Sequence, residues 1–194
     1  MTDWSAKAFD QLNIKADDIL KIDFAHSEFF ECRFEHCTFI STDFRDAHFN
    51  DCTFENCSIL LTNIGDCRFQ SVHFTGSKIS GLDFTTANDF LMQLSFENCK
   101  IEGCGFSGLQ LSQTQFSSCE INQCDFFGAN LEESDFSFSR FDHTIFQQTD
   151  LRKANFKNAE GYEINPLENK LRGATFSLPE ASSMFKHIGI IIEE

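Results

Sequence analysis

Phenylalanine recurs at every fifth position of the segment ECRFEHCTFISTDFRDAHFNDCTFENC, which spans residues 31 to 57. Neither an α-helix, with about 3.6 residues per turn, nor a simple strand, with about two, has this period. The recurrence begins at Phe24 and continues to Phe84, with isoleucine at some positions. After a slip of two residues it resumes at Leu91 and ends at Phe156. Repetition over most of the chain predicts an architecture in which each unit packs on the next.

A second regularity places a small residue two positions before most of the large ones. Cysteine, serine, threonine and alanine share this position, and it holds all nine cysteines of the chain. Residues i and i−2 of an extended chain point to the same side, so the large and the small side chain of each unit are expected to face inward together. The other three positions carry nearly all of the charge and are expected to face solvent.

This pattern resembles that of the pentapeptide-repeat proteins, whose units read small residue, polar, Phe or Leu, polar, polar. The resemblance covers residues 22–159, apart from a register break near 85–90. It implies an all-β fold, a right-handed quadrilateral β-helix in which four units form one square coil. Residues 1–21 are expected to form an N-terminal cap. Residues 160–194 are expected to form a last partial coil, a short C-terminal helix and a capping or dimerisation segment.

The cysteines have a structural interpretation in such a fold. Twenty residues, or one coil, separate Cys32 from Cys52, and three further pairs have the same spacing. These pairs are expected to stack inside the rod, where cysteine behaves as a small apolar residue. Disulfides and a metal site are the functional alternatives. The odd number of cysteines, the lack of a C-x-x-C motif and the absence of a histidine at ligand spacing argue against both.

The C-terminal segment SLPEASSMFKHIGIIIEE departs from the repeat. Pro179 suits the first turn of a helix, and Gly189 suits the position just after its end. A helix between them places several apolar residues on one face, and the isoleucines that follow are expected to form a short strand. This segment caps the rod or forms a dimer interface, and the two roles are compatible. The interface residues predicted here are Leu178, Ala181, Met184, Phe185, Ile188, Ile190 and Ile192.

Two motifs that suggest chemistry in other folds are better explained by the repeat. GCGFSG, residues 103–108, matches the dinucleotide-binding G-x-G-x-x-G pattern, but that motif needs a strand before it and a helix after it. The acidic cluster LEESD, residues 131–135, lies at outward positions of a convex rod, where no cleft shifts the carboxyl pKa values. We therefore predict no catalytic residue, no cofactor, no metal site and no small-molecule substrate, and interpret the chain as a non-enzyme.

The chain has 30 acidic and 15 basic residues, and its net charge of −15 disfavours nucleic acid and anionic membranes as partners. The charge either maintains solubility alone or attracts a basic protein. Acidic residues one coil apart are expected to stack in columns, where they repel one another and oppose folding. The columns are therefore a candidate partner-binding surface: Asp23, Asp43, Asp83 and Asp125; Glu35, Glu55 and Glu97; Asp46 and Asp66; Glu31 and Asp51.

The charge density of the expected rod is close to that of DNA. Duplex DNA carries one charge per about 1.7 Å of axis. Fifteen net charges over a rod of roughly 35 Å give one per about 2.3 Å. A stiff acidic rod of this kind is suited to a basic groove that binds DNA. No segment is apolar enough to span a membrane and the N-terminus has no secretion-signal pattern, so a soluble, cytoplasmic protein is expected.

The C-terminal 30 or so residues resemble those of the Qnr-type quinolone-resistance and microcin-immunity group of pentapeptide-repeat proteins. Members of this group dimerise through the C-terminus, mimic DNA, and bind DNA gyrase or topoisomerase IV. The resemblance implies a homodimer whose partner is a type II topoisomerase. Some members carry long projecting loops, whereas this chain has only the short break with Asp89 and Phe90. The alternative is a structural scaffold with no topoisomerase partner.

Overall fold

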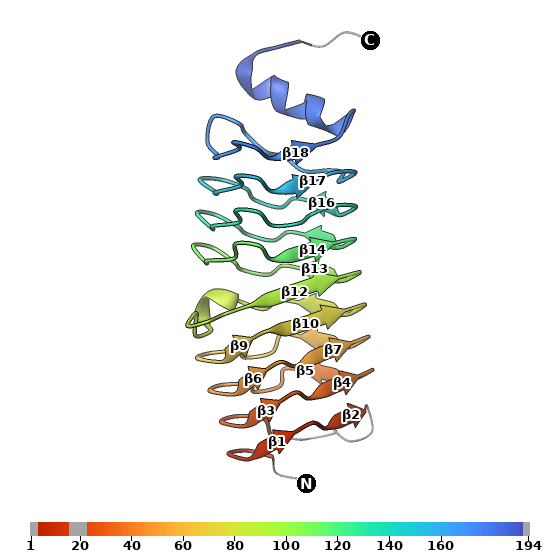
Figure 1. Ribbon diagram of the computed structural model, residues 1–194, viewed down its shortest axis with the longest axis vertical. Helices are drawn as coiled ribbons and strands as arrows, with labels where there is room; N and C mark the ends of the chain where they lie inside the picture. Colours follow the sequence, from red (N-terminus) through yellow and green to blue (C-terminus); the bar gives the residue numbers. More distant parts are fainter. Residues whose placement is uncertain (1–3, 16–22, 192–194) are drawn as a thin grey trace.

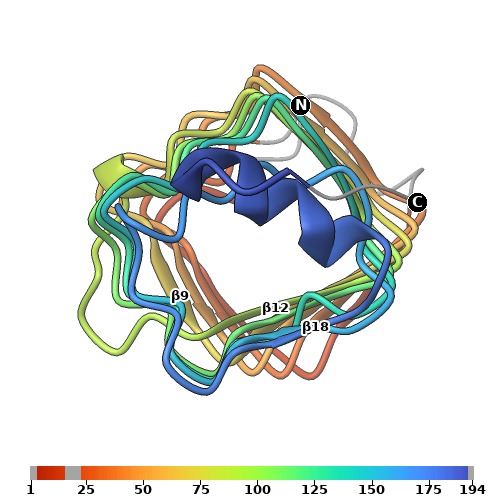
Figure 2. The same ribbon diagram turned by 90° about the horizontal axis from the view of Figure 1, so that it is seen from above.

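The computed structural model describes residues 4–15 and 23–191 and shows a straight rod of about eight stacked coils (Figure 1). Seen along its axis, the rod has four sides around a common core (Figure 2). The first strand, β1, lies at one end of the rod and a short helix lies across the other end (Figures 1 and 2). The right-handed quadrilateral β-helix predicted from the sequence is confirmed.

Three of the four sides carry short β-strands that pair in parallel along the rod, and we call these sides faces A, B and C. Face A begins with β1 (Ala8–Asp10), β3 (Glu28–Phe30), β6 (His48–Asn50) and β9 (Arg68–Gln70). Face B contains β2 (Asn13–Lys15), β4 (Arg33–Glu35), β7 (Thr53–Glu55), β10 (Val72–Thr75), β12 (Leu94–Glu97) and β14 (Gln115–Ser117). It continues to β17 (Asn155–Phe156) and β18 (Thr175–Phe176). Face C contains β5 (Thr38–Ile40), β8 (Ser58–Leu60), β11 (Lys78–Ser80), β13 (Lys100–Glu102), β15 (Glu120–Asn122) and β16 (Arg140–Asp142).

The fourth side, face D, has no strand among the described residues. It carries the 3-10 turn η2 (Phe84–Thr86) and is held together by isolated parallel bridges between coils. The bridges of this face include Asp43 with Asn63, and Gly105 with both Asp83 and Asp125. Face D therefore places the first predicted acidic column along one side of the rod.

Neighbouring coils pair residues that are 20 apart, as the repeat predicts. Phe34 lies opposite Phe54, and Phe54 lies opposite Phe74. Across the break the offset becomes 22, with Phe74 opposite Phe96. The same register extends to β1 and β2, which pair with β3 and β4, so strand pairing continues into the segment expected to form the N-terminal cap.

The large residues of the repeat form a ladder of rings inside the rod, and every predicted position except Leu91 is buried. Rings one coil apart stack almost parallel, with centroids 4.6 Å apart for Phe34 and Phe54. Rings on adjacent faces meet edge to face, as do Phe34 and Phe39 at 5.9 Å. Both arrangements suit the ring quadrupole, and each adds about 0.5–1.5 kcal/mol to the burial of the side chains. This ladder explains why phenylalanine fills one position so often.

The register break lies on face A, where the chain bulges away from the coil (yellow-green segment in Figure 2). Arg68 still pairs with Asn88 at an offset of 20, so the two additional residues lie after Asn88. Leu91 was predicted to point inward, but it is 63% exposed, and the prediction is wrong. With the two additional residues, the segment is too long for a side that holds five residues, so the chain leaves the coil at Asp89. Met92 packs against the core in place of Leu91.

The small inward position supplies hydrogen-bond donors as well as space. Ser77 Oγ donates to the carbonyl oxygen of Phe54, 3.0 Å away in the preceding coil, and Cys119 Sγ lies 3.5 Å from that of Phe96. All nine cysteines are buried, as predicted, and carry free thiols. Burial raises the pKa of the Cys67 thiol well above its ordinary value. The sequence interpretation of these cysteines as small apolar residues therefore missed their polar role.

The corners of the coil are made by residues with positive φ, two positions after the large residue. Glycine and asparagine adopt this left-handed conformation easily, as at Gly76 (φ 59°) and Asn56 (φ 52°). Leu61 (φ 50°) and Phe138 (φ 59°) adopt it as well, although large apolar residues rarely do. The five-residue spacing alone gives no sign of this backbone requirement.

The C-terminal helix is the 3-10 helix η3 (Glu180–Ile188), preceded by Pro179 and ended by Gly189 in the left-handed conformation, as predicted. Met184 packs against the last coil, and the rest of the helix lies on the end of the rod without a buried residue. Ile190 and Ile191 form no strand, so the expected strand is absent from the described residues, and Ile192 lies outside them.

Candidate partner-binding surface

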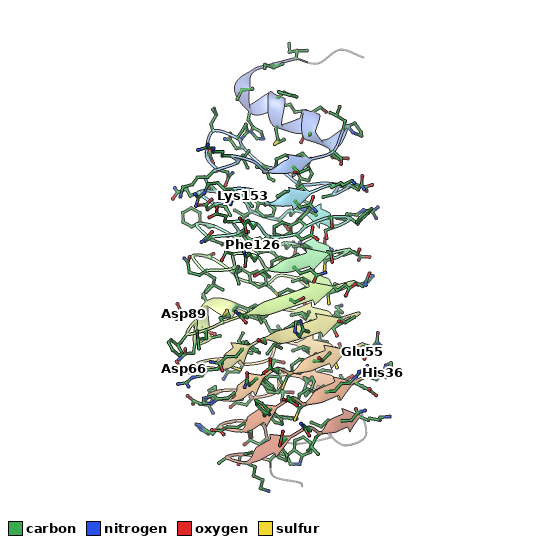
Figure 3. The ribbon with its side chains drawn as sticks, viewed as in Figure 1. His36, Glu55, Asp66, Asp89, Phe126 and Lys153 are labelled. Atoms are coloured by element: carbon green, nitrogen blue, oxygen red, sulfur yellow. The ribbon has the colours of Figure 1, made fainter. Side chains whose placement is uncertain are left out.

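The predicted acidic columns run along two sides of the rod. On face B, Glu35 pairs in register with Glu55, and Thr75 lies between Glu55 and Glu97. On face D, Asp83 and Asp125 flank Gly105. In Figure 3, Glu55 and Asp66 project from opposite sides of the rod, while Phe126 points into its core. The acidic residues therefore do not form a single stripe.

Several of these carboxylates are neutralised by cations that the sequence interpretation did not consider. Arg33 bridges two coils, because its guanidinium contacts Glu55 and lies 2.8 Å from Glu35 Oε1. Arg45 pairs with Asp43 at 2.7 Å, and its hydrogen bond holds the pKa of that carboxyl below the usual range. The columns were expected to oppose folding, yet at these positions ion pairs offset the repulsion.

Other predicted carboxylates have no ion pair among the described residues. This set comprises Asp23, Glu31, Asp51, Asp66, Asp83, Glu97 and Asp125. Asp46 occupies an intermediate position, since its ion pair within the described chain is with His26, 3.4 Å away. Three members of the set, Asp23, Asp83 and Asp125, lie in one column on face D. Face D therefore carries more of these carboxylates than any other side of the rod.

Comparisons with known proteins agree with this architecture. Residues 27–106 match the family model "Pentapeptide repeat region", and residues 95–132 and 119–158 match "Pentapeptide repeats (8 copies)". The chain belongs to the pentapeptide-repeat family. No curated protein sequence matches it.

Among solved pentapeptide-repeat structures, two trypsin-treated variants of QnrB1, a plasmid-mediated fluoroquinolone resistance protein, are similar to this chain. One superposes with a TM-score of 0.78 over 98% of this chain and 93% of that chain. The other has a TM-score of 0.63 and covers 99% of this chain and 100% of that chain. Both are 16% identical in sequence to it, so the similarity concerns the fold.

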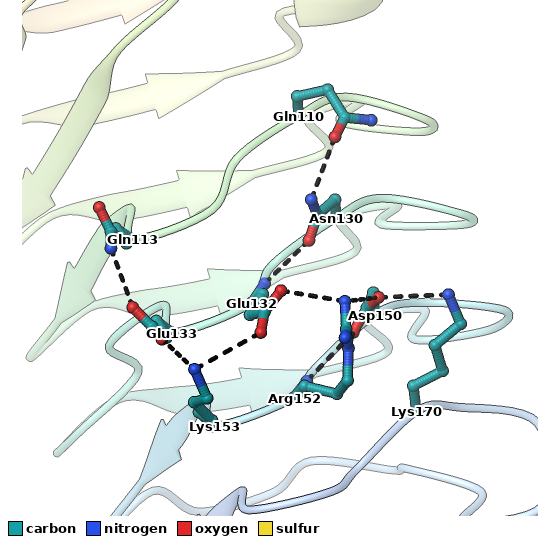
Figure 4. Close-up of polar contacts among 9 residues, drawn as sticks. All are labelled: Gln110, Gln113, Asn130, Glu132, Glu133, Asp150, Arg152, Lys153 and Lys170. Carbon is teal, nitrogen blue, oxygen red and sulfur yellow. Dashed lines mark hydrogen bonds and ion pairs between the residues drawn. The ribbon is translucent and has the colours of Figure 1, made fainter.

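The acidic cluster LEESD of this pentapeptide-repeat chain forms an ion-pair network near the C-terminal end (Figure 4). Glu132 accepts a hydrogen bond from Arg152 at 2.9 Å, and Lys153 pairs with Glu132 and Glu133. Asp150 lies between Arg152 and Lys170, and its hydrogen bond with Arg152 lowers its pKa to about 2. The network joins three coils. Its geometry explains the cluster as a structural feature.

The C-terminal end of the rod exposes a group of apolar side chains. Leu178 and Ile191 are mostly exposed, and Phe185, Ile188 and Ile190 are more than one-third exposed. Ala181 is half-buried, and Met184 is taken up by the contact with the last coil. The predicted interface residues within the described chain thus gather on η3 and its flanks, and most of them have no intramolecular cover.

The loop at the register break exposes Asp89, Phe90 and Leu91 together. Asn88 Oδ1 accepts a hydrogen bond from the amide of Phe90 at 3.0 Å, which shapes the turn. The loop is short, as the sequence indicated, and Figure 3 shows Asp89 at the edge of the rod.

The described residues contain no group of three or more His, Cys, Asp or Glu side chains arranged to hold a metal ion. In the same part of the chain, no helix has the length and apolar character needed to cross a membrane.

Proposed function

We propose that this pentapeptide-repeat protein binds a type II topoisomerase, DNA gyrase or topoisomerase IV, as a mimic of DNA and protects it from inhibitors such as quinolones or peptide toxins. It acts by binding and performs no catalysis. The proposal places the protein in the cytoplasm with its partner.

The observation that carries the proposal is the set of carboxylates on face D that form no ion pair among the described residues. Asp23, Asp83 and Asp125 stand along a rigid rod whose net charge is −15. These three carboxylates lie two or more coils apart and repel one another weakly, so their negative charge is available to an external basic partner. The similarity in shape to QnrB1, which confers fluoroquinolone resistance, supports the same assignment.

A homodimer formed through the C-terminal end belongs to this proposal. The exposed apolar side chains of Leu178, Phe185 and Ile188 are suited to pairing with a second copy, because burial of apolar surface drives association. Two rods joined end to end double the length of the acidic surface. A dimer also covers the open end of the last coil, which lacks a buried residue on η3.

A scaffold without a topoisomerase partner is the second candidate, and one observation favours it. Arg33, Arg45 and Arg152 neutralise many of the carboxylates that mimicry of DNA requires to be exposed. If ion pairing of this kind extends to the functional surface, the charge serves solubility and coil stacking alone.

A gyrase-binding and supercoiling assay distinguishes the two candidates. The double variant Asp83→Asn with Asp125→Asn removes two carboxylates of face D and keeps the side-chain oxygens that accept backbone hydrogen bonds. We expect it to bind gyrase at least tenfold more weakly, with a smaller dependence on salt, and to lose protection against a quinolone.

The matched control is Asp10→Asn with Asp142→Asn, which removes two exposed carboxylates from faces A and C. Equal weakening in both double variants means that bulk charge, and not face D, carries the interaction. If the unmodified protein does not bind gyrase even at low salt, the scaffold function stands in its place.

A further inference from the structure

An apolar ridge lies at the border between faces C and D, in the N-terminal half of the rod. Ile40 and Leu60 occupy paired positions in β5 and β8, and Leu61 forms the next corner. Ile40 is 61% exposed and Leu61 is 67% exposed. Their neighbours along face C are Thr38, Ser58 and Ser80, and the ion pair of Lys78 and Glu102 borders this group. The ridge is therefore a small apolar patch on a rod that is otherwise rich in charge.

Leu61 is unfavourable for folding in two respects. Its backbone is left-handed (φ 50°), a conformation that costs a residue with a Cβ about 1–2 kcal/mol. Its side chain is also exposed to water. Asparagine or glycine at this corner avoids both costs, as Gly81 does one coil further along. A large apolar residue in a strained and exposed position indicates a function outside the fold.

A hollow of about 420 Å³ adjoins the ridge on the side of face D. Its floor is formed by backbone, because Gly81, Gly103 and Gly105 have no side chains there. A Cβ placed on Gly81 would lie 2.6 Å from Leu61 Cδ2, so the Leu61 side chain leans over Gly81 toward the hollow. A Cβ on Gly103 would meet no atom within 4 Å. The hollow is thus open, with an apolar wall at one end.

Gly105 lies between two carboxylates, Asp83 in the preceding coil and Asp125 in the following coil. Asp83 leans toward the hollow, since its Oδ1 lies 2.9 Å from where a Cβ of Gly105 would be. Asp83 Oδ1 accepts hydrogen bonds from the amide and hydroxyl of Thr85, and Asp125 Oδ1 accepts one from the amide of Phe127. Neither carboxylate has a cationic partner within the described residues, and the Oδ2 atom of each accepts no hydrogen bond there.

From these features we propose that the ridge of Ile40, Leu60 and Leu61, together with the glycine hollow between Asp83 and Asp125, is a docking surface for a protein segment that presents an arginine beside an apolar side chain. The guanidinium enters the hollow and donates to the Oδ2 atoms, and the apolar side chain packs on the ridge. Arginine fits better than lysine, because its planar fork donates several hydrogen bonds in one plane.

The combination of features excludes other occupants. A nucleic acid has the wrong charge for Asp83 and Asp125 and gains nothing from an apolar ridge. A second acidic rod of the same kind is repelled for the same reason. A basic segment with an apolar neighbour satisfies both parts of the surface. The identity of the partner as a topoisomerase rests on the proposed function, whereas the chemistry of the docked segment does not.

Two separate variants test the proposal: one fills the hollow with a side chain, and the other removes an apolar side chain from the ridge. Gly105→Leu fills the hollow, and the fold accommodates a branched side chain at this repeat position, as Ile145 shows two coils further along face D. Leu61→Asn removes the ridge and relieves the left-handed strain. Gln115→Leu, at the same repeat position on face B, is the matched control. Melting temperatures establish that each variant is folded.

Titration with DNA gyrase gives the first readout. We expect Gly105→Leu and Leu61→Asn to lose at least tenfold in affinity while Gln115→Leu binds as the parent does. Leu61→Asn should melt at or above the parent temperature, so its loss of affinity is not a loss of folding. If both variants bind as tightly as the parent, the docking surface is refuted and the proposed function remains intact.

A synthetic peptide gives the second readout and does not depend on gyrase. One peptide places an arginine between two leucines, and its counterpart carries uncharged citrulline in place of the arginine. In NMR spectra, the arginine peptide should shift the methyl groups of Ile40 and Leu61 and the amides of Gly103 and Gly105, and the citrulline peptide should not. If gyrase does not bind the parent, the proposed function fails, and these shifts alone decide the docking surface. No shift, or equal shifts with both peptides, refutes it.

Discussion

Replacing Arg33 tests whether ion pairs between coils offset the repulsion of the acidic columns. Arg33 is half-exposed and contacts Glu35 and Glu55, which lie opposite each other in neighbouring strands. Arg33→Gln keeps most of the side chain and removes its charge. Lys15 remains 3.6 Å from Glu35, so that carboxylate keeps one weaker partner, and Glu55 keeps none among the described residues.

The expected loss of stability follows from two terms. Each exposed ion pair contributes about 0.2–1 kcal/mol, and Arg33 makes two. The two carboxylates, one strand spacing of about 4.8 Å apart, then repel by about 0.9 kcal/mol in bulk water and roughly half of that at physiological ionic strength. The sum predicts that Arg33→Gln lowers the free energy of unfolding by about 1–3 kcal/mol at low salt, and by less at high salt.

Equilibrium unfolding in urea at low and high salt measures this difference. Arg68→Gln is the matched control, because Arg68 holds the same repeat position on face A, and within the described chain its side chain forms no ion pair. Both variants change the net charge equally, so their difference isolates the contacts of Arg33. The reasoning is wrong if Arg68→Gln is destabilised as much as Arg33→Gln, or if the loss at Arg33 is the same at high salt.

Three further predictions follow from the same structure. Ser77→Ala leaves the buried amide of Cys57 without its acceptor, 2.9 Å away, and should cost about 1–3 kcal/mol in urea unfolding. Thr114→Val, which removes a hydroxyl with no hydrogen bond of its own to another described residue, should cost clearly less; equal costs would contradict this account. Asp150 has a pKa of about 2, below the ordinary 3.8, because of its hydrogen bond with a neighbouring arginine. A lowered pKa stabilises the folded state above the ordinary value, so about 2 kcal/mol should be lost as the pH falls from about 4 to about 2. Asp150→Asn should flatten that part of the stability curve, and an unchanged curve would show that the carboxyl does not contribute. Deletion of residues 178–194 should convert a dimer to a monomer or to aggregates in sedimentation, and a full-length chain that sediments as a monomer at micromolar concentration would remove the dimer.

The five-residue period predicted the core almost completely because it reports directly which side chains face inward. It failed at Leu91, since a sequence pattern shows that two residues are added but not where the chain leaves the coil. The polar role of Ser77 and Cys119 was also missed, because their acceptors are carbonyls in the preceding coil. Such partners are visible only once the coils are stacked.

The candidate surface was less predictable than the core. The columns themselves follow from the 20-residue coil, but their effective charge depends on the side-chain conformations of cations such as Arg33 and Arg45. The hollow beside Asp83 depends on the absence of side chains at three glycines in different repeats. Gly81 is 22 residues before Gly103, and Asp83 is 42 residues before Asp125. A motif search along the chain does not combine residues at such distances.

The spacing of the coils has a consequence for any match to DNA. Carboxylates on one face of the rod recur about every 4.8 Å, whereas phosphates along one DNA strand recur about every 3.4 Å of axis. The two spacings agree only over a longer distance, because five coils and seven nucleotides both span about 24 Å. Asp23 and Asp125 are separated by five coil steps, through positions 43, 63, 83 and 105. Seven nucleotides, however, turn through about two-thirds of the DNA helix, because one turn contains about 10.5 base pairs. The two phosphates therefore face different sides of the duplex, whereas Asp23 and Asp125 face the same side of the rod. A groove that binds both DNA and this rod needs long, adjustable basic side chains.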